Sequence, residues 1–361
     1  MKTAILLNDT SYENHHGCSI VIKNIERNLL QRDIRLIATN PIGQKWKKNH
    51  SFSEALRTCD IVLVNAEGTI HHCSPYGLTL LEIVDATEKP CILMNMTYQS
   101  NSDEYVDLIR KFAKVYVRES MSQKELASVG IDAKVVPDMT FDSSYEIAGQ
   151  RDTHIYITDS HDIKLSEALY HITQRSHVKF LPILAPYEKF SSKKGLIKKI
   201  KYAFFMYMGE MIPNIVPLKY SYLRYMHVCK EKTFVEHIGH CNLLITARFH
   251  ALCIAIQTLT PFIVLKSNTH KIEGLLQDMQ FSQNRIIELS ALEKLVKNTD
   301  LNTSTFAFTT AEVEKIRSYM KDAKIYIKHM FDEINNLSDK YDTIYEKSSL
   351  PQIVHNDSEQ E

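Results

Sequence analysis

The sequence predicts an α/β protein built from two doubly wound, parallel-sheet (Rossmann-like) domains and a long C-terminal helix. Its 361 residues exceed one ordinary domain and are enough for two, each with its own core. Short apolar runs alternate with longer amphipathic runs along most of the chain, which is the pattern of βα units. The short runs are continuously apolar rather than alternating, as in parallel strands that are covered on both faces.

The first domain is expected to cover residues 1–145. Its predicted strands span residues 3–7, 34–38, 61–65, 91–94, 115–117 and 134–136. Its predicted helices span residues 19–30, 53–58, 78–86, 104–112 and 122–129. Gly130 follows the last of these helices, at the position where a left-handed residue commonly ends a helix. The alternation indicates one parallel sheet with helices on both faces.

The second domain is expected to cover residues 153–300, after a polar linker that begins at Asp142. Its predicted strands span residues 154–158, 178–184, 243–245 and 262–265. Its predicted helices span residues 164–173, 233–240, 251–257 and 272–279. Two facing domains of this kind form a GT-B-like architecture, and open parallel sheets bind ligands beyond the carboxyl ends of their strands. A site is therefore expected in the cleft between the domains.

Three further segments complete the chain. An insertion at residues 185–229 is longer than typical loops, which indicates a functional segment. Five lysines between residues 193 and 201 precede an aromatic and aliphatic run. The insertion therefore suits a peripheral contact with the inner membrane leaflet, a contact with the acceptor, or a packed segment with a solvated rim. Residues 309–348 are predicted to form the C-terminal helix, and residues 351–361 a disordered tail.

Composition excludes several classes of protein. Hydrophobic residues make up 44% of the chain and charged residues 24%, as in soluble globular proteins. Forty-three basic residues balance forty-three acidic ones, so no nucleic-acid partner is predicted. The N-terminal apolar run ends at Asn8, which is too early for a signal peptide, and no segment is long enough to span a bilayer. Seven scattered cysteines without a CxxC spacing predict a reduced, cytoplasmic protein, membrane-associated only if the insertion binds lipid.

No cofactor or metal is predicted. The chain has no GxGxxG motif, no P-loop, no GxSxG motif and no kinase signature. The run His71-His72-Cys73 carries metal-ligating side chains. Adjacent residues cannot easily share one ion, however, and no second ligand cluster has a suitable spacing.

Two arginines directly follow apolar strands and begin helices. Arg118 and Arg248 hold mirrored positions in the two domains. A guanidinium and a helix N-terminus converge well on one anion, so the two arginines predict an anion site in the cleft. The alternative is that each arginine makes a structural ion pair, with Glu119 or Asp138 as candidate partners.

His250 and Glu67 are the candidate catalytic residues. His250 lies two residues after Arg248, where its imidazole can exchange a proton near neutral pH. A capping or core histidine is the alternative. Glu67 lies in a turn after the third strand, where its carboxylate can bind or deprotonate a sugar hydroxyl. The alternative is an ordinary glutamate at a helix start, stabilised by the helix dipole.

Further cleft candidates lie in the loops after the strands. Gly68 lets the backbone approach a ligand closely, and Thr69 follows it. Asp138 follows the sixth strand, and His15, His16 and Gly17 form a candidate ligand lip in the first loop, from which His16 and Gly17 are taken as contacts. These five residues are the predicted acceptor or cleft contacts.

In these segments the sequence resembles the polysaccharide pyruvyl transferase family. The segments that carry the resemblance are Asn8-Asp9-Thr10 with Gly17, Val117-Arg118-Glu119-Ser120 with Leu126 and Gly130, Val136-Pro137-Asp138, and Thr246-Ala247-Arg248-Phe249-His250-Ala251 followed by Pro261 and Lys271. The similarity is patchy and runs from the N-terminus to about Met279. The Arg-x-His element is its most specific part.

This resemblance implies transfer of enolpyruvate from phosphoenolpyruvate to a sugar, usually ending as a cyclic ketal. On the matched positions, it implies that Arg118 and Arg248 hold the donor's phosphate and carboxylate and that His250 carries the proton. Ser120 and Lys271 are further donor-binding candidates. The implied partners are phosphoenolpyruvate or another anionic donor, and a sugar or lipid-linked acceptor that is a precursor of a cell-surface glycan.

One departure from the family pattern keeps an alternative open. Family members often carry a glycine-rich turn after the third strand, whereas this chain has Ala66-Glu67-Gly68-Thr69. The alternative is a GT-B glycosyltransferase with Glu67 as base, which uses a nucleotide sugar in capsule, lipopolysaccharide or exopolysaccharide synthesis. A non-enzymatic partner in glycan assembly is a third hypothesis, and the intact Arg118, Arg248 and His250 argue against it.

Overall fold

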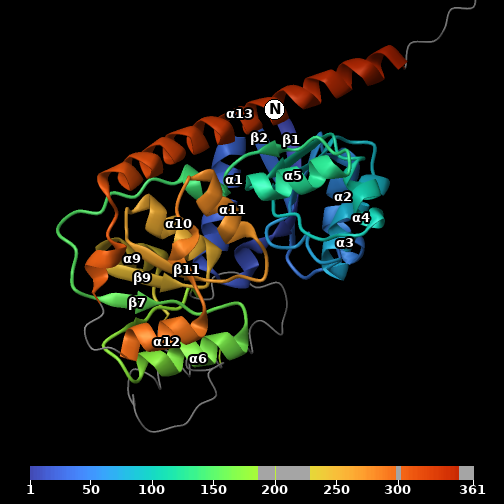
Figure 1. Cartoon of the computed structure of the whole chain (residues 1–361). Helices are drawn as coiled ribbons and strands as arrows, with labels where there is room; N and C mark the ends of the chain where they lie inside the picture. The colour runs from blue at the N-terminus through green and yellow to red at the C-terminus, as the bar shows by residue number, and fades with distance from the viewer. Residues whose placement is uncertain (186–199, 201–227, 298–301, 349–361) are drawn as a thin grey trace, which may run out of the picture.

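The computed structural model describes residues 1–185, 200, 228–297 and 302–348 (Figure 1). Two parallel sheets with helices on their faces are joined by one long helix, which confirms the predicted fold class. Most of the insertion predicted at residues 185–229, with its lysines, lies outside the described residues, as does the tail at 351–361. Within the described residues, no helix has the length and apolar character needed to cross a membrane. The domain boundaries at residues 145 and 153 stay predictions.

The first sheet has six parallel strands in the order β2-β1-β3-β4-β5-β6. Its strands are β1 (Lys2–Asp9), β2 (Ile34–Pro41), β3 (Ile61–Asn65), β4 (Cys91–Met96), β5 (Lys114–Val117) and β6 (Lys134–Val135). Its helices are α1 (His16–Leu30), α2 (His50–Thr58), α3 (Pro75–Leu81), α4 (Asp103–Ile109) and α5 (Ser120–Ser128). Gly130 follows α5 with φ +75°, which confirms the predicted helix end.

Alternate residues of the central strands enter different cores, as buried parallel strands require. In β1, Ile5 and Leu7 face the apolar cluster under α2, α3, α4 and α5. Ala4 and Leu6 face the opposite cluster, which contains α1. Each face of the sheet is therefore covered, and only the strand ends are left to contact a ligand.

The second sheet has five parallel strands in the order β11-β10-β9-β7-β8. Its strands are β7 (Ile155–Ile157), β8 (Lys179–Phe180), β9 (Leu243–Thr246), β10 (Phe262–Leu265) and β11 (Ile286–Ile287). Helices α6 (Ile163–Thr173) and α12 (Leu289–Lys297) lie side by side on one face (Figure 1). Helices α9 (Glu231–His240), α10 (Phe249–Gln257) and α11 (Lys271–Asp278) cover the other face.

Each domain has an apolar cluster of its own, as the sequence predicts, and a third cluster is shared by both domains. Helix α13 (Thr310–Ser348) runs along both domains (Figure 1). Its residues Ile316, Ile327 and Phe331 enter the same buried cluster as α1 of the first domain and α10 of the second. Arg32 of the first domain pairs with Asp332 of α13, and Arg285 of the second pairs with Glu312. The helix therefore fixes the two domains against each other.

Four elements differ from the prediction. The helix predicted at 78–86 begins earlier, at Pro75, and becomes a 3-10 turn after Leu81. The strand predicted at 178–184 is only Lys179–Phe180, and Leu184 instead makes an isolated antiparallel bridge with His15. Strand β11 and helix α12 were not predicted. A two-residue strand such as β11 gives no recognisable periodicity.

Candidate active site

The carboxyl ends of the strands of both sheets face each other where the two domains are in contact, as the sequence predicts for this fold class, and this region is called the cleft below. From the first sheet come the loop after β1, the Glu67 turn after β3, Arg118 after β5 and Asp138 after β6. From the second sheet come a carboxylate after β7, the start of α10 after β9 and the start of α11 after β10. The structure thus brings together most of the predicted site residues.

Arg118 makes a buried ion pair with Asp138, which is the structural alternative considered from sequence. Its Nη1 donates to Asp138 Oδ2 at 2.9 Å, and its Nε and Nη2 both donate to Thr97 Oγ1. The side chains of the pair are 2% and 0% exposed. The guanidinium also lies over the Phe249 ring, 4.7 Å from its centroid, and so contacts the second domain.

Arg248 pairs with Asp159, a residue that the sequence analysis did not single out. The Asp159 side chain is fully buried, and its other oxygen accepts a bond from the backbone of Ile183. The Arg248 side chain is more accessible, 15% exposed, and its Nε has no hydrogen-bond partner in the described part of the chain. Arg248 can therefore still donate a hydrogen bond to a bound anion.

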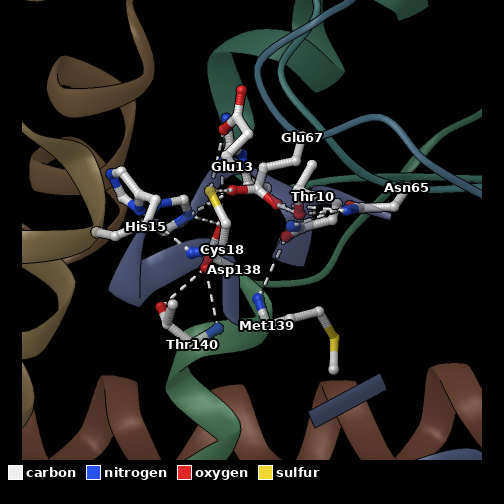
Figure 2. Close-up of polar contacts among 12 residues, drawn as sticks. Thr10, Glu13, His15, Cys18, Asn65, Glu67, Asp138, Met139 and Thr140 are labelled. Carbon is white, nitrogen blue, oxygen red and sulfur yellow. Dashed lines mark hydrogen bonds and ion pairs between the residues drawn. The ribbon is translucent and has the colours of Figure 1, made fainter. Parts of the chain in front are cut away.

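Glu67 is held in place by neighbours in its own domain (Figure 2). Its Oε2 accepts from Thr10 Oγ1 at 2.7 Å and from Asn65 Nδ2 at 3.3 Å. Its Oε1 lies 3.2 Å from His250 Nε2. Glu67 is not at a helix start, since α3 begins only at Pro75. Its carboxylate is instead oriented across the cleft.

His250 lies in the first turn of α10 and faces both carboxylates of the first domain. Its Nε2 is 3.2 Å from Glu67 and 3.7 Å from Asp138, but neither contact has hydrogen-bond geometry. Burial alone would raise the pKa of Asp138, but His250 and Arg118 together lower it well below its ordinary value. An ionised Asp138 stabilises a positive imidazole beside it, as proton transfer by His250 would require.

Lys271, at the start of α11, adds a third cation. Burial, followed by the nearby charges of Arg118 and Arg248, lowers the pKa of its amine to about 8. Lysine pKa values fall when cations crowd a poorly solvated amine, and a bound anion reverses the effect. The three cations therefore mark the place where an anion would be stabilised most.

Three predicted contacts face elsewhere. His16 is buried and stacks on Phe234 at 4.7 Å, and burial lowers its pKa to about 4. The cleft-facing histidine is its neighbour, His15, because adjacent residues at a helix start point in different directions. Gly17 is buried under His250, and a Cβ there would lie 2.2 Å from the His250 Cβ. It permits close helix packing and is not a lip.

Ser120 lies beside a separate cavity. Its backbone N–H donates to Asp278, and the residue is part of the lining of this cavity of about 630 Å³ beneath α13. None of Arg118, Arg248 and His250 lines that cavity. Gly68 has φ +63° with open space beside it, as expected for a turn near a ligand. Thr69 is buried with no partner for its hydroxyl in the described chain.

The loop after β1 and the start of α1 supply two residues that the sequence analysis missed, Glu13 and Cys18, beside His15 of the predicted lip. Cys18 Sγ lies 3.1 Å from Glu67 Oε1 and 3.4 Å from Glu13 Oε2 (Figure 2). The His15 ring packs edge-on against His250. Applying the strand-end rule to the first strand as strictly as to the others would have included these residues.

Residues 7–269 match the model of the polysaccharide pyruvyl transferase family. The chain belongs to this family. No curated protein matches the chain significantly. Membership supports a transferase that modifies a polysaccharide.

Solved structures with a similar chain course are distant. A UDP-GlcNAc 2-epimerase from Methanocaldococcus jannaschii, in complex with UDP-GlcNAc and UDP, is 12% identical with a TM-score of 0.47, over 89% of this chain and 100% of that one. The spinosyn rhamnosyltransferase SpnG with thymidine diphosphate is 10% identical with a TM-score of 0.48, over 90% and 96%. A UDP-GlcNAc 2-epimerase from Neisseria meningitidis is 10% identical with a TM-score of 0.45, over 89% and 99%. Similarity at this level is no guide to the substrate.

Proposed function

We propose that this protein transfers a pyruvyl (enolpyruvate) group from phosphoenolpyruvate to a sugar of a cell-surface glycan precursor in the cytoplasm. The observation that carries the proposal is the convergence of Arg248, Lys271 and Arg118 around His250 in a cleft of a pyruvyl transferase family member. A small donor with a phosphate and a carboxylate needs several cationic donors and one proton carrier, and no nucleotide pocket.

The charges of the cleft support an anionic donor. Arg118 and Arg248 are each paired with one aspartate, so their charges are already balanced. Within the described residues, Lys271 Nζ donates a hydrogen bond to Asn268 Oδ1 at 3.3 Å, and no carboxylate lies at hydrogen-bond distance from it. The Lys271 ammonium and the remaining guanidinium N–H groups of Arg248 are therefore the groups that an incoming anion would contact.

The proposed reaction gives each central residue one role. His250 donates a proton to the methylene carbon of the enolpyruvate, which leaves an oxocarbenium-like centre at the neighbouring carbon. A sugar hydroxyl attacks that centre and its proton passes to Glu67. Phosphate then leaves, and a second hydroxyl attacks the same carbon and closes the ketal, with its proton passing to the departing phosphate. Glu67 Oε1, 3.2 Å from His250 Nε2, can return the proton to the imidazole between turnovers.

The alternative is a glycosyltransferase that uses a nucleotide sugar. Glu67 favours it, because Thr10 and Asn65 hold one carboxylate oxygen and the other faces Cys18 and His250, where it can act as a base. In that case the donor would release a nucleotide, and Lys271 and Arg248 would contact its diphosphate. Both hypotheses place the chemistry in the same cleft, and they differ in the donor.

A donor screen followed by turnover separates them. Phosphoenolpyruvate should raise the melting temperature of the full chain by mass action, and nucleotide sugars should not. With a soluble glycan acceptor, phosphate release should then depend on both substrates. Stabilisation by a nucleotide sugar, with nucleotide release, would establish the alternative. Absence of turnover with every donor would favour a non-enzymatic role in glycan assembly.

A further inference from the structure

Three metal-ligating side chains converge at the centre of the cleft. Among the described residues, the ligand atoms of His15, Cys18 and His250 all lie within 4.8 Å of one another. All three residues are buried. His15 caps α1 and Cys18 lies in its first turn, whereas His250 comes from α10 in the second domain. The cluster thus forms only when both domains are folded and packed together.

Glu67 supplies a fourth candidate ligand atom. Its Oε1 lies 3.1 Å from Cys18 Sγ and 3.2 Å from His250 Nε2. Zinc bonds of about 2.0–2.3 Å in a tetrahedron require ligand atoms about 3.3–3.6 Å apart, so these two separations are close to that geometry. The other oxygen of Glu67 is fixed by Thr10 and Asn65 (Figure 2), as the outer atoms of metal ligands usually are.

The second observation is an unsatisfied nitrogen. His250 is 7% exposed, and its Nε2 has no hydrogen-bond partner in the described chain although it lies 3.2 Å from Glu67 Oε1. Buried polar atoms are normally paired, and an exception indicates a missing partner or a functional use. A cation between the four side chains would provide that partner.

We propose that His15, Cys18, His250 and Glu67 bind one divalent cation of the zinc class. Two imidazoles, one thiolate and one carboxylate are a ligand set that Zn²⁺ accepts, and a hard cation such as Mg²⁺ would not select it. The thiolate and the carboxylate together balance the two positive charges. Cys18 donates its thiol hydrogen toward Glu67 and Glu13 in the free protein, so binding replaces the S–H bond and releases one proton to solvent.

His15 is the ligand that must change most. Its Nδ1 accepts a 3.3 Å bond from the backbone N–H of Cys18, which caps α1. If Nδ1 coordinates the metal, its lone pair is no longer available to the Cys18 N–H. If Nε2 coordinates instead, Nδ1 carries the proton and cannot accept a hydrogen bond. The cap bond is therefore lost in both cases. The proposal replaces the expectation from sequence that the chain holds no metal, because ligands at positions 15, 18 and 250 share no recognisable spacing.

The metal and the proposed proton transfer compete for the same atom. A cation on His250 Nε2 removes the lone pair that would carry the proton, so the metal-bound protein is a resting form. The inference does not depend on pyruvyl transfer, because metal binding is measured without any donor. Metal binding by a protein without transfer activity would overturn the proposed function and leave the metal site. Transfer activity in a protein that binds no metal would overturn the metal site and leave the proposed function.

Cobalt(II) titration of the full, chelator-treated chain tests the proposal. One equivalent of Co²⁺ should give a thiolate charge-transfer band in the near ultraviolet and the intense visible bands of four-coordinate cobalt, and Zn²⁺ should abolish both. Cys18→Ser should lose the charge-transfer band, while Cys73→Ser, an exposed cysteine of the same domain, should keep it. His15→Gln should weaken binding at least ~10-fold.

Several results would overturn the proposal. These are the absence of saturable cobalt binding, a charge-transfer band that survives Cys18→Ser, or its equal loss in Cys73→Ser. Far-ultraviolet circular dichroism shows whether each variant is folded. Should Cys18→Ser fail to fold, His15→Gln decides, since unchanged cobalt affinity in that folded variant contradicts the site.

Discussion

The two arginine–aspartate pairs hold mirrored positions in the two domains, yet their surroundings differ. Arg118 and Asp138 are 2% and 0% exposed, and all three nitrogens of Arg118 are engaged by Asp138 and Thr97. Arg248 is 15% exposed, and its Nε has no partner in the described chain. Equivalent positions in the fold therefore support a structural pair on one side and an anion-binding group on the other.

The difference follows from what each guanidinium packs against. Arg118 lies on Phe249, the residue that starts α10, so it joins the first domain to the second. Removing one partner of a buried ion pair leaves the other charge without compensation. Arg248 lies close enough to Lys271 to lower the pKa of its amine. No carboxylate in the described chain lies at hydrogen-bond distance from that amine. We infer that Arg118 organises the cleft and that Arg248 contacts the donor.

The largest expected effect is on His250, which lies between the two pairs. His250→Gln should lower the maximal transfer rate by about 10²–10⁴-fold, because glutamine cannot donate and accept the proton. Donor affinity and melting temperature should stay near those of the wild type. A variant that loses donor binding or unfolds at a much lower temperature would show that His250 is a structural residue.

Arg118→Met should have the largest effect on stability. It leaves Asp138 buried without its counter-ion and removes the contact with Phe249. We expect the free energy of unfolding to fall by about 3–5 kcal/mol, measured by urea denaturation. The double variant Arg118→Met with Asp138→Leu should recover much of the loss. If the free energy of unfolding of the single variant fell by less than about 1 kcal/mol, the structural role of this pair would be contradicted.

The effect expected for Lys271 is smaller: the affinity for the donor should depend on pH. Its pKa is lowered to about 8, first by burial and then by the two arginines, so the amine loses its proton as pH rises above about 8. An anionic donor needs the charged form, and its affinity should fall by up to ~10-fold per pH unit above that value. Calorimetric titration with phosphoenolpyruvate between pH 7 and 9.5 measures the slope.

Lys271→Arg is the control for this prediction. A guanidinium stays charged throughout the range, so the pH dependence of donor affinity should flatten. The same slope in both proteins would mean that another group controls donor binding.

The sequence predicts well which residues lie at the ends of the strands, but poorly which side chains these residues contact. Arg118, Arg248, His250 and Glu67 could be placed because each lies within the first few residues after a continuous apolar run, and such runs are reliable signs of buried parallel strands. Asp159 also follows a strand, but its role depends on facing Arg248, which is a contact across 89 residues of sequence.

Local errors have equally physical causes. His16 was chosen over His15, and a shift of one residue at a helix start turns a side chain from the cleft into the core. Ser120 lines the cavity beneath α13, and no pattern near residue 120 indicates a helix that begins 190 residues later. The shared core has the same origin, because α13 buries its apolar face against both domains.

The most direct test of the difference between the two pairs compares Arg118→Lys with Arg248→Lys in one experiment. The melting temperature of each variant is measured without donor and with saturating phosphoenolpyruvate. Lysine keeps the charge but loses the planar fork. Arg248→Lys should melt near the wild type without donor and lose most of the donor-induced shift, with transfer efficiency at least ~10-fold lower. Arg118→Lys should melt at a clearly lower temperature and keep the shift. Equal behaviour of the two variants in both measurements would contradict the account.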